Sequence, residues 1–479
     1  MFDKLKEECG VFGMFSKENI DIAPYTYYAL FALQHRGQES CGIVVNDDGI
    51  MALHKNVGLV NEVFTPEIMA TLGKGNISIG HVRYGTTGTR PRLNAQPLMV
   101  NHIKGSMALA HNGNLINDAE LREELELEGS IFHTTSDTEV ISYVIVKERL
   151  TASSIEEAVV RAMDRIKGAY SLLIMSPTKL IAVRDPNGFR PLCMGRLGEN
   201  YVFASESCAF DAMGATFIRD IKPGEVVVVD REGIRCLETH CNKVKRSMCV
   251  FEYIYFARPD SVIDGASVHN ARLRAGAFLA LEHPIQADVV VGVPDSGIDA
   301  AIGYSRQSGI PYGIGLIKSK YIGRTFIQPN QAQRENSVRL KLNPIASVLK
   351  DKRVILIDDS IVRGTTSARL VKLIREAGAK EVHMRISAPP FRFPCYFGTD
   401  IDSQENLIAT NHTIDEIGQM IGVDSLGYLS VDSVKKLAEN GDNGFCTACF
   451  SGLYPVEIPK SNHKSKYERK ISENKESDE

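Results

Sequence analysis

The sequence has no long apolar segment, no leader-like start and no strong excess of charge of either sign. No window approaches the roughly eighteen uncharged apolar residues that a membrane-spanning helix needs. Residues 1–8 mix acids with lysines where a signal peptide would be apolar. The formal net charge of -4 gives no reason to expect nucleic acid or an anionic membrane as a partner. We therefore expect a protein of the cytoplasm.

The length and the cysteine content indicate a two-domain protein with reduced thiols. A chain of 479 residues is too long for one hydrophobic core, so two domains are the first expectation. The 10 cysteines would lie in a reducing compartment, where catalysis or metal binding is a better use than disulfides. Residues 461–479 are almost all charged or polar, which predicts a disordered tail.

Short apolar runs and helical spacing alternate through the first half. The helices are expected at residues 22–33, 137–150 and 155–166. The strands are expected at residues 11–15, 43–45, 77–79, 107–110, 171–175, 180–183, 201–204 and 225–229. Many strands with few helices favour an α+β layered sandwich.

After about residue 248 the pattern changes. Residues 287–293 and 353–357 are nearly continuous apolar runs, each followed by a polar loop and a helix, and residues 385–387 form a third strand-like piece after a helix at 367–378. Strands buried on both faces and alternating with helices are typical of a parallel α/β sheet. We place the domain boundary at residues 241–248.

Cys9 is the candidate nucleophile of the first half. Taken alone, a cysteine before a glycine is more often a buried structural thiol. If residues 1–8 were removed, the α-amine of Cys9, which ordinarily has a pKa of about 8, could activate its thiol. Asn112-Gly113 similarly has two interpretations, a hairpin turn or an oxyanion hole made from an amide side chain and a backbone N–H.

Taken together, the polar segments of the first half resemble the glutaminase domain of the class II amidotransferases, which are N-terminal nucleophile hydrolases with an αββα sandwich. The segments are Cys9-Gly-Val-Phe-Gly13, the Arg83 loop, Asn112-Gly113, Asp137, Arg184-Asp-Pro-Asn-Gly188 and Ala204-Ser-Glu-Ser207. The resemblance implies a domain over residues 9–241 in which Cys9 attacks the glutamine carboxamide. It further implies that Arg83 holds the glutamine carboxylate, Asp137 its α-amino group, and Asn112 and Gly113 the oxyanion.

Residues 354–366 form the most specific motif of the second half. An apolar strand ends in Asp358 and Asp359, and a small-residue loop then opens a helix, which makes an anion site beside two carboxylates suited to hydroxyls or hydrated Mg²⁺. The alternative is a buried strand followed by a polar helix cap.

This motif is similar to the phosphoribosyl pyrophosphate motif of type I phosphoribosyltransferases, here over residues 249–460. The similarity implies that Asp358 and Asp359 contact the ribose diol and Mg²⁺, and that Ser296, in a second loop, contacts Mg²⁺. Residues 318–336 resemble the loop that closes over the substrate, or are only a solvated loop. The 5′-phosphate would be bound by Arg363, Gly364, Thr365 and Thr366.

Cys446-Thr-Ala-Cys449 alone is compatible with redox or zinc chemistry, although a zinc ribbon would offer a second CxxC. The order of the two halves matches the glutamine phosphoribosylpyrophosphate amidotransferase family, in its iron–sulfur-containing subclass. That resemblance implies a [4Fe–4S] cluster on Cys249, Cys395, Cys446 and Cys449, and a cleaved propeptide at residues 1–8. The other cysteines are expected to be ordinary core or surface residues.

The family resemblance also implies the reaction and the partners. Ammonia from glutamine would replace the pyrophosphate of phosphoribosyl pyrophosphate and give 5-phosphoribosylamine at the entry to purine synthesis. Purine nucleotides are the implied feedback inhibitors and a homotetramer the implied assembly. A closed route for ammonia between the sites is a hypothesis from the two-site architecture. The alternative is a ligand-sensing regulator with a phosphoribosyltransferase fold and no catalysis.

Overall fold

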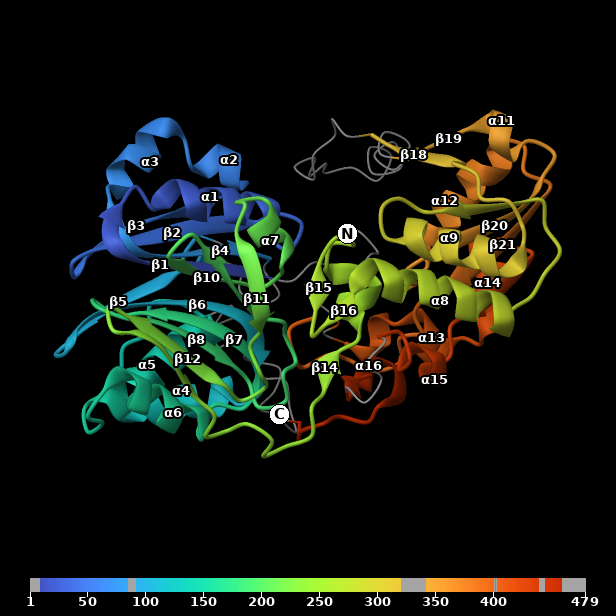
Figure 1. Cartoon of the computed structure of the whole chain (residues 1–479). Coiled ribbons are helices and arrows are strands. Elements are labelled where there is room, and N and C mark those ends of the chain that lie inside the picture. The colour runs from blue at the N-terminus through green and yellow to red at the C-terminus, as the bar shows by residue number, and fades with distance from the viewer. Residues whose placement is uncertain are drawn as a thin grey trace, which may run out of the picture.

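The protein consists of two halves that lie side by side, one built on antiparallel sheets and one on a parallel sheet (Figure 1). The computed structural model describes residues 9–84, 92–319, 342–399, 401, 403–438 and 444–458. The predicted propeptide (residues 1–8) and the predicted tail (residues 461–479) lie outside the described residues. None of the described helices combines the length and the apolar character that a membrane crossing requires.

The first half contains two stacked antiparallel sheets. The seven-stranded sheet has the order β11 (Thr216–Asp220), β9 (Cys193–Leu197), β10 (Asn200–Ala204), β1 (Gly10–Ile20), β4 (Gly75–Arg83), β2 (Ser40–Asp47) and β3 (Ile50–Val57). The six-stranded sheet has the order β13 (Gly233–Leu237), β12 (Val226–Asp230), β8 (Leu180–Arg184), β7 (Gly168–Met175), β6 (Gly105–Leu115) and β5 (Leu98–His102).

The alternation of side chains along β1 explains why layers lie on both faces of its sheet. Val11 and Phe15 lie in the core between the two sheets, whereas Phe12 and Met14 lie in the core beneath the outer helix α1 (Ala23–Ala32). Successive side chains of a strand point to opposite faces, so a strand that is apolar at every position needs cover on both.

Helices supply that cover on the two outer faces (Figure 1). With α1, the seven-stranded sheet carries α2 (Val60–Val63), α3 (Pro66–Leu72) and α7 (Cys208–Asp211). The six-stranded sheet carries α4 (Asp118–Leu127), α5 (Asp137–Arg149) and α6 (Ile155–Met163). The four layers are those of the αββα sandwich, which confirms the predicted fold class.

The second half is built on a parallel sheet with the order β17 (Val289–Gly292), β20 (Arg353–Asp358), β21 (Glu381–Ile386) and β22 (Ser425–Tyr428). Its longer helices are α8 (Val268–Glu282), α9 (Gly297–Ser308), α12 (Thr365–Glu376) and α14 (Ile414–Ile421). The short helices are the π-helix η1 (Glu252–Phe256), α11 (Ala346–Leu349), the 3-10 helix η2 (Gln404–Asn406), α13 (Ile408–Asn411), α15 (Val431–Val434) and α16 (Ala448–Ser451). Three small strand pairs complete it: β14 (Met248–Cys249) with β23 (Phe445–Cys446), β15 (Val262–Ile263) with β16 (Ala266–Ser267), and β18 (Leu316–Lys318) with β19 (Leu342–Pro344).

The third strand of this sheet lies earlier than predicted. The sequence indicated residues 385–387, but β21 runs from Glu381 to Ile386. The charged and polar residues of this strand concealed its extent in the sequence, since such residues are usually exposed. His383 and Arg385 are nevertheless buried, with exposed fractions of 5% and 4%. Helix α12 likewise begins two residues before the predicted start, at Thr365.

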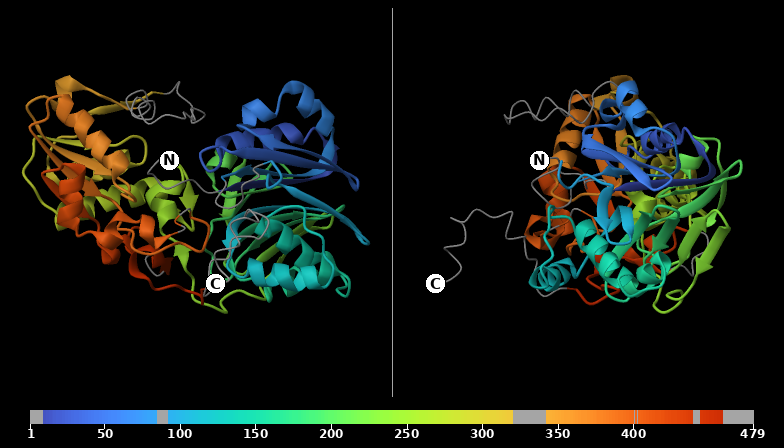
Figure 2. Two further views of the ribbon diagram at one scale, coloured as in Figure 1. Left: turned by 180° about the vertical axis from the view of Figure 1, so that it is seen from behind. Right: turned by 90° about the vertical axis from the view of Figure 1, so that its left-hand side faces the viewer.

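Buried ion pairs join the two halves, which lie side by side when the molecule is seen from behind (Figure 2). Arg184 at the end of β8 donates two hydrogen bonds to Asp264 in the β15–β16 turn, at 2.8 and 2.9 Å. Arg246 also pairs with Asp264. The last strand of the antiparallel sheets ends at Leu237 and β14 begins at Met248. The exact domain limits stay predictions.

Candidate active sites

Cys9 lies directly before β1, at the end of the seven-stranded sheet. Its Sγ donates a hydrogen bond to the carbonyl oxygen of Tyr84 at 3.7 Å, and its side chain is partly exposed. Gly10 pairs with Val82 of the neighbouring strand β4, so the register brings Cys9 beside Arg83. A partly exposed thiol at the end of a rigid sheet can reach a substrate, unlike the fully buried thiol of the alternative interpretation.

Arg83 is the last residue of β4 and has an exposed fraction of 5%. Its Nη1 donates to Oε2 of Glu39 at 3.1 Å. A guanidinium held at a strand end beside the thiol suits a substrate carboxylate, because its fork matches two oxygens. The continuation of this predicted loop, residues 85–87, lies outside the described residues.

Asn112 and Gly113 lie inside β6, where they pair with Ser171 and Tyr170 of β7. The hairpin-turn interpretation is therefore wrong. The Nδ2 atom of Asn112 is buried and has no hydrogen-bond acceptor among the described residues. Gly113 has φ of 147°, and a Cβ there would lie 2.0 Å from the carbonyl oxygen of Ala169. A buried amide donor without an acceptor costs free energy unless a ligand oxygen uses it.

A histidine pair places Asn112 near the thiol. His81 of β4 lies opposite Val11 in the sheet, and its Nε2 lies 2.9 Å from the carbonyl oxygen of His111 on β6. Burial lowers the pKa of His81 to about 3, so its ring is neutral and Nε2 donates the proton. This bond joins the two sheets at His111, next to Asn112, and at His81, opposite Val11 and two residues along the sheet from Cys9.

Asp137 is the first residue of α5, after the N-cap Ser136, whose Oγ accepts a hydrogen bond from Thr138 N. Its Oδ2 accepts from Leu115 N at 3.0 Å, and its Oδ1 lies 3.6 Å from His111 Nδ1. Burial raises the pKa of Asp137, but the charge and hydrogen bonding of His111 and the N–H groups of Leu115 and Thr138 outweigh burial and hold the pKa below its usual value. The result is a carboxylate beside the Asn112-Gly113 strand, suited to an ammonium group.

In the second half, the carboxyl end of β20 and the loop after β17 meet at one edge of the sheet. Asp358 and Asp359 have exposed fractions of 1% each. Ser296 Oγ donates to Asp359 Oδ1 at 2.5 Å, and Ser360 Oγ donates to Asp359 Oδ2 at 2.5 Å. Clustered carboxylate and hydroxyl oxygens are the ligands that Mg²⁺ prefers.

The loop after Asp359 ends at the N-terminus of α12. Gly364 is the N-cap residue, with a left-handed φ of 84°, and Thr365 and Thr366 form the first turn. The N–H groups and hydroxyls of such a turn favour a bound phosphate. Lys318 pairs with Asp295 of the loop after β17, and most of the predicted closing loop, residues 320–336, lies outside the described residues.

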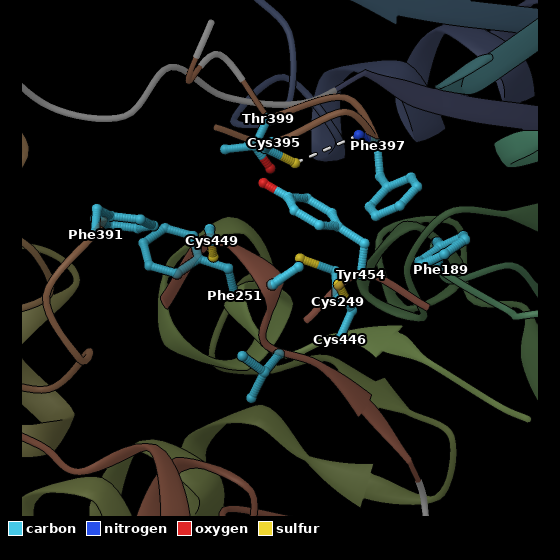
Figure 3. Close-up of a pocket in the computed structure, with 12 residues that line it drawn as sticks. Phe189, Cys249, Phe251, Phe391, Cys395, Phe397, Thr399, Cys446, Cys449 and Tyr454 are labelled. Atoms are coloured by element: carbon cyan, nitrogen blue, oxygen red, sulfur yellow. Dashed lines mark hydrogen bonds between the residues drawn. The ribbon is translucent and has the colours of Figure 1, made fainter. Parts of the chain in front are cut away.

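Four cysteines from three distant segments line one small cavity (Figure 3). They are Cys249, Cys395, Cys446 and Cys449. The rest of the lining is mostly apolar and comprises Phe189, Val250, Phe251, Phe391, Phe397, Thr399, Ala448 and Tyr454. Burial raises the pKa of the Cys446 thiol to about 12, and burial with the charges of the other three raises that of Cys449 well above its usual value.

The donor set of this cavity is of the kind that an iron–sulfur cluster uses. The described residues contain no group of three His, Cys, Asp or Glu side chains placed to hold one metal ion. A [4Fe–4S] cluster takes one thiolate on each of its four irons, so its ligands stand farther apart than those around zinc. Four thiols from three segments around an apolar cavity supply the number of ligands for such a cluster.

A buried ionic cluster behind Cys9 was missed by the sequence reasoning. Arg36 pairs with Glu206 and with Glu252, and all three side chains are fully buried. The segment that carries Glu206 was among the motifs that resemble the glutaminase domain, but no sequence signal linked Arg36 or Glu206 to Glu252, 216 residues from Arg36.

Comparisons with known proteins agree with the two-site arrangement. Residues 82–212 match the model of a glutamine amidotransferase domain, and residues 268–388 match that of a phosphoribosyl transferase domain. The amidophosphoribosyltransferase of Bacillus subtilis is 50% identical over 460 residues, covering 95% of both chains. That of Methanocaldococcus jannaschii is 50% identical over 464 residues, covering 94% of this chain and 98% of its own. The solved structure of glutamine phosphoribosylpyrophosphate amidotransferase from B. subtilis, complexed with ADP and GMP, superposes with a TM-score of 0.88 at 48% identity, covering 95% of this chain and 99% of that one.

Proposed function

The chain belongs to the amidophosphoribosyltransferase family, and from this premise we propose how its residues divide the reaction between two sites. The enzyme takes ammonia from glutamine and uses it to replace the pyrophosphate on C1 of phosphoribosyl pyrophosphate. The products are 5-phosphoribosylamine, glutamate and pyrophosphate, at the first step of de novo purine biosynthesis.

In the first half, we assign Cys9 as the nucleophile once residues 1–8 have been removed. The free α-amine takes the thiol proton, the sulfur attacks the carboxamide carbon, and the proton passes to the departing ammonia. Water then hydrolyses the thioester to glutamate. Arg83 holds the substrate carboxylate and Asp137 its α-ammonium group. The developing oxyanion accepts hydrogen bonds from Asn112 Nδ2 and Gly113 N–H.

The unpartnered Nδ2 of Asn112 is the observation that carries this assignment. Buried donors are nearly always satisfied in folded proteins. An unsatisfied donor on the strand that His81 joins to the sheet of Cys9 is explained by an oxygen that arrives with the substrate.

In the second half, we assign Asp358 and Asp359 to the ribose hydroxyls. Arg363, Gly364, Thr365 and Thr366 bind the 5′-phosphate at the N-terminus of α12. Ser296 and the two carboxylates present the oxygen ligands for Mg²⁺, which would neutralise charge on the pyrophosphate as it leaves.

A [4Fe–4S] cluster on Cys249, Cys395, Cys446 and Cys449 would tie together three segments of the second half. Cys395 Sγ already accepts a hydrogen bond from Phe397 N at 3.4 Å (Figure 3), and Tyr454 Oη donates to Pro394 O at 2.7 Å. The surroundings of the sulfurs are therefore ordered around the cavity, which supports a structural cluster.

The remaining assignments follow from the family. Purine nucleotides are proposed as feedback inhibitors, which the B. subtilis relative solved with ADP and GMP supports. We further propose a homotetramer, a cytoplasmic location and a closed route for ammonia between the two sites. Free ammonia that competes fully with glutamine-derived nitrogen would contradict the closed route.

The assignment of Cys9 is tested by measuring pyrophosphate release from phosphoribosyl pyrophosphate with glutamine or with ammonia as nitrogen source. We expect Cys9→Ala to lose glutamine use and to keep ammonia use. Cys236→Ala, at an exposed cysteine outside both sites, is the matched control and should keep both. A wild-type chain that begins at Met1 and still hydrolyses glutamine fully would refute the mechanism. If wild type and Cys9→Ala consume no phosphoribosyl pyrophosphate with either source, the second-half assignment fails and the regulator alternative returns.

A further inference from the structure

A buried charge cluster of two arginines and two glutamates spans the boundary between the halves, directly behind the proposed nucleophile. Arg36 Nη1 donates to Glu206 Oε1 at 2.5 Å and to Glu252 Oε2 at 3.0 Å, and its Nη2 donates to Glu252 Oε1 at 2.8 Å. Arg190 Nη1 reaches the same Glu252 Oε1 at 3.5 Å. Arg36, Arg190 and Glu206 belong to the first half, whereas Glu252 opens the π-helix η1 of the second.

The cluster is connected to the thiol residue by a single rigid group. Arg36 Nε donates to the carbonyl oxygen of Cys9 at 3.0 Å. The guanidinium is planar and its donors are fixed relative to one another, so the carboxylate that receives Nη1 and Nη2 also fixes where Nε points. Through this group, Glu252 sets the position of the Cys9 carbonyl.

The same turn of chain fixes the carboxylate-binding arginine. Gly37, next to Arg36, packs so closely on β4 that a Cβ would lie 2.6 Å from Arg83 N. A shift of Arg36 would therefore move its neighbour against the backbone of Arg83. The Arg36–Gly37 segment therefore contacts both the nucleophile Cys9 and the carboxylate-binding Arg83.

Glu252 is the partner that only the second half can supply. Glu206 is held by several other donors, among them Ser261 Oγ at 2.7 Å and Arg258 N at 2.9 Å. The backbone around Glu252 is fixed in turn by Arg272, which donates to the carbonyl oxygens of Tyr253, Tyr255 and Ala257 at 2.9, 3.0 and 2.7 Å. The position of the Glu252 carboxylate is thus imposed by the fold of the phosphoribosyl transferase half.

We propose that Glu252 is a positioning residue for glutamine cleavage: a carboxylate of the second half, acting through Arg36, holds Cys9 in its reactive place. The inference rests on the proposed role of Cys9 as nucleophile. Its consequence is that the glutaminase site is incomplete until the second half has docked against the first.

The test compares glutamine-dependent with ammonia-dependent pyrophosphate release in Glu252→Gln, an isosteric change that removes the charge. We expect kcat with glutamine to fall about 100-fold, the scale of a nucleophile misplaced by about 1 Å. The KM for phosphoribosyl pyrophosphate and the rate with ammonia should stay within a few-fold of wild type. Alkylation of Cys9 by a glutamine-like electrophile should slow in parallel with glutamine use.

Asp264→Asn is the matched control, because Asp264 is an equally buried carboxylate of the second half that pairs with Arg184 of the first. It should lower the melting temperature and leave the ratio of glutamine to ammonia activity unchanged. If Glu252→Gln does not fold, Glu252→Asp keeps the charge and withdraws it by one methylene, and we expect an intermediate loss of the ratio.

A Glu252 variant that folds and keeps the wild-type ratio, or that loses both activities in the proportion seen for Asp264→Asn, overturns the proposal. Cys9→Ala measured beside it separates the two hypotheses. If Cys9→Ala still uses glutamine, the assignment of the nucleophile fails; if it does not and Glu252→Gln does, only the positioning role fails.

Discussion

Replacement of Asn112 by leucine should lower the rate of glutamine cleavage without lowering the stability of the fold. The two side chains share the same branched shape, although leucine is the larger, and leucine lacks the Nδ2 donor that has no acceptor among the described residues. Removing one oxyanion-hole donor costs about 10²–10³ in kcat, or roughly 2.7–4 kcal/mol of transition-state stabilisation. A buried unsatisfied donor costs the fold about 1–3 kcal/mol, so its removal should not lower the melting temperature.

The assay for Asn112→Leu is glutamine-dependent glutamate release, with ammonia-dependent pyrophosphate release as the internal reference. The reverse pattern is expected for Ser171→Ala on the paired strand β7. Ser171 Oγ donates to Arg190 O at 3.3 Å, so its loss should cost about 1 kcal/mol of stability and leave glutamine cleavage intact. Glutamine cleavage by Asn112→Leu within a few-fold of wild type would refute the oxyanion hole.

Three further changes test the acid response, the phosphoribosyl site and the cysteine cavity. Burial lowers the pKa of His81 from 6.5 to about 3. The stability from its neutral form is therefore complete above pH 6.5 and is lost as pH falls toward 3, by roughly 4–5 kcal/mol in all. His81→Gln should flatten the unfolding free energy in that pH range, and curves parallel to wild type would exclude His81 as the cause. Asp359→Asn should raise the KM for phosphoribosyl pyrophosphate about 10-fold or more with both nitrogen sources, and an unchanged KM and Mg²⁺ dependence would remove Asp359 from the site. Cys446→Ser should lower iron content and melting temperature together, whereas full iron content in the variant would show that Cys446 is not a ligand.

Most central strands of the first half and three of its longer helices were predictable from the sequence, and the edge strands were not. Residues 11–15 and 171–175 are apolar at nearly every position because both faces are covered, and each falls inside an observed strand, β1 and β7. The edge strands β3, β5, β11 and β13 were missed because they are half-exposed and mix apolar with polar residues, as at Lys55 in β3 and Arg219 in β11. The inner strand β9 was missed as well. The pattern of apolar residues along a sequence indicates which residues are buried, and edge strands bury fewer residues than central ones.

The candidate site was predictable where its residues lie in one motif. Asp358 ends the strand β20 and Asp359 and Gly364 follow it, so the order of strand, loop and helix places them without further information. The partners of Arg36 could not be predicted in this way, because the pairing of Arg36 with Glu252 depends on how two domains dock. Nothing near either residue encodes that contact.

The ion pairs of Arg36 and Arg184 with the second half also have a consequence for how the chain folds during its synthesis. At about 5–20 residues per second, roughly 10–40 seconds pass after the ribosome has added Arg36 before it adds Glu252, and roughly 4–16 seconds pass between Arg184 and Asp264. During that time the nascent first half holds cationic side chains that lack the carboxylates of the second half, although Arg36 already has Glu206. The surface that later docks is meanwhile open to water and to chaperones. A first half expressed alone would permanently lack these partners.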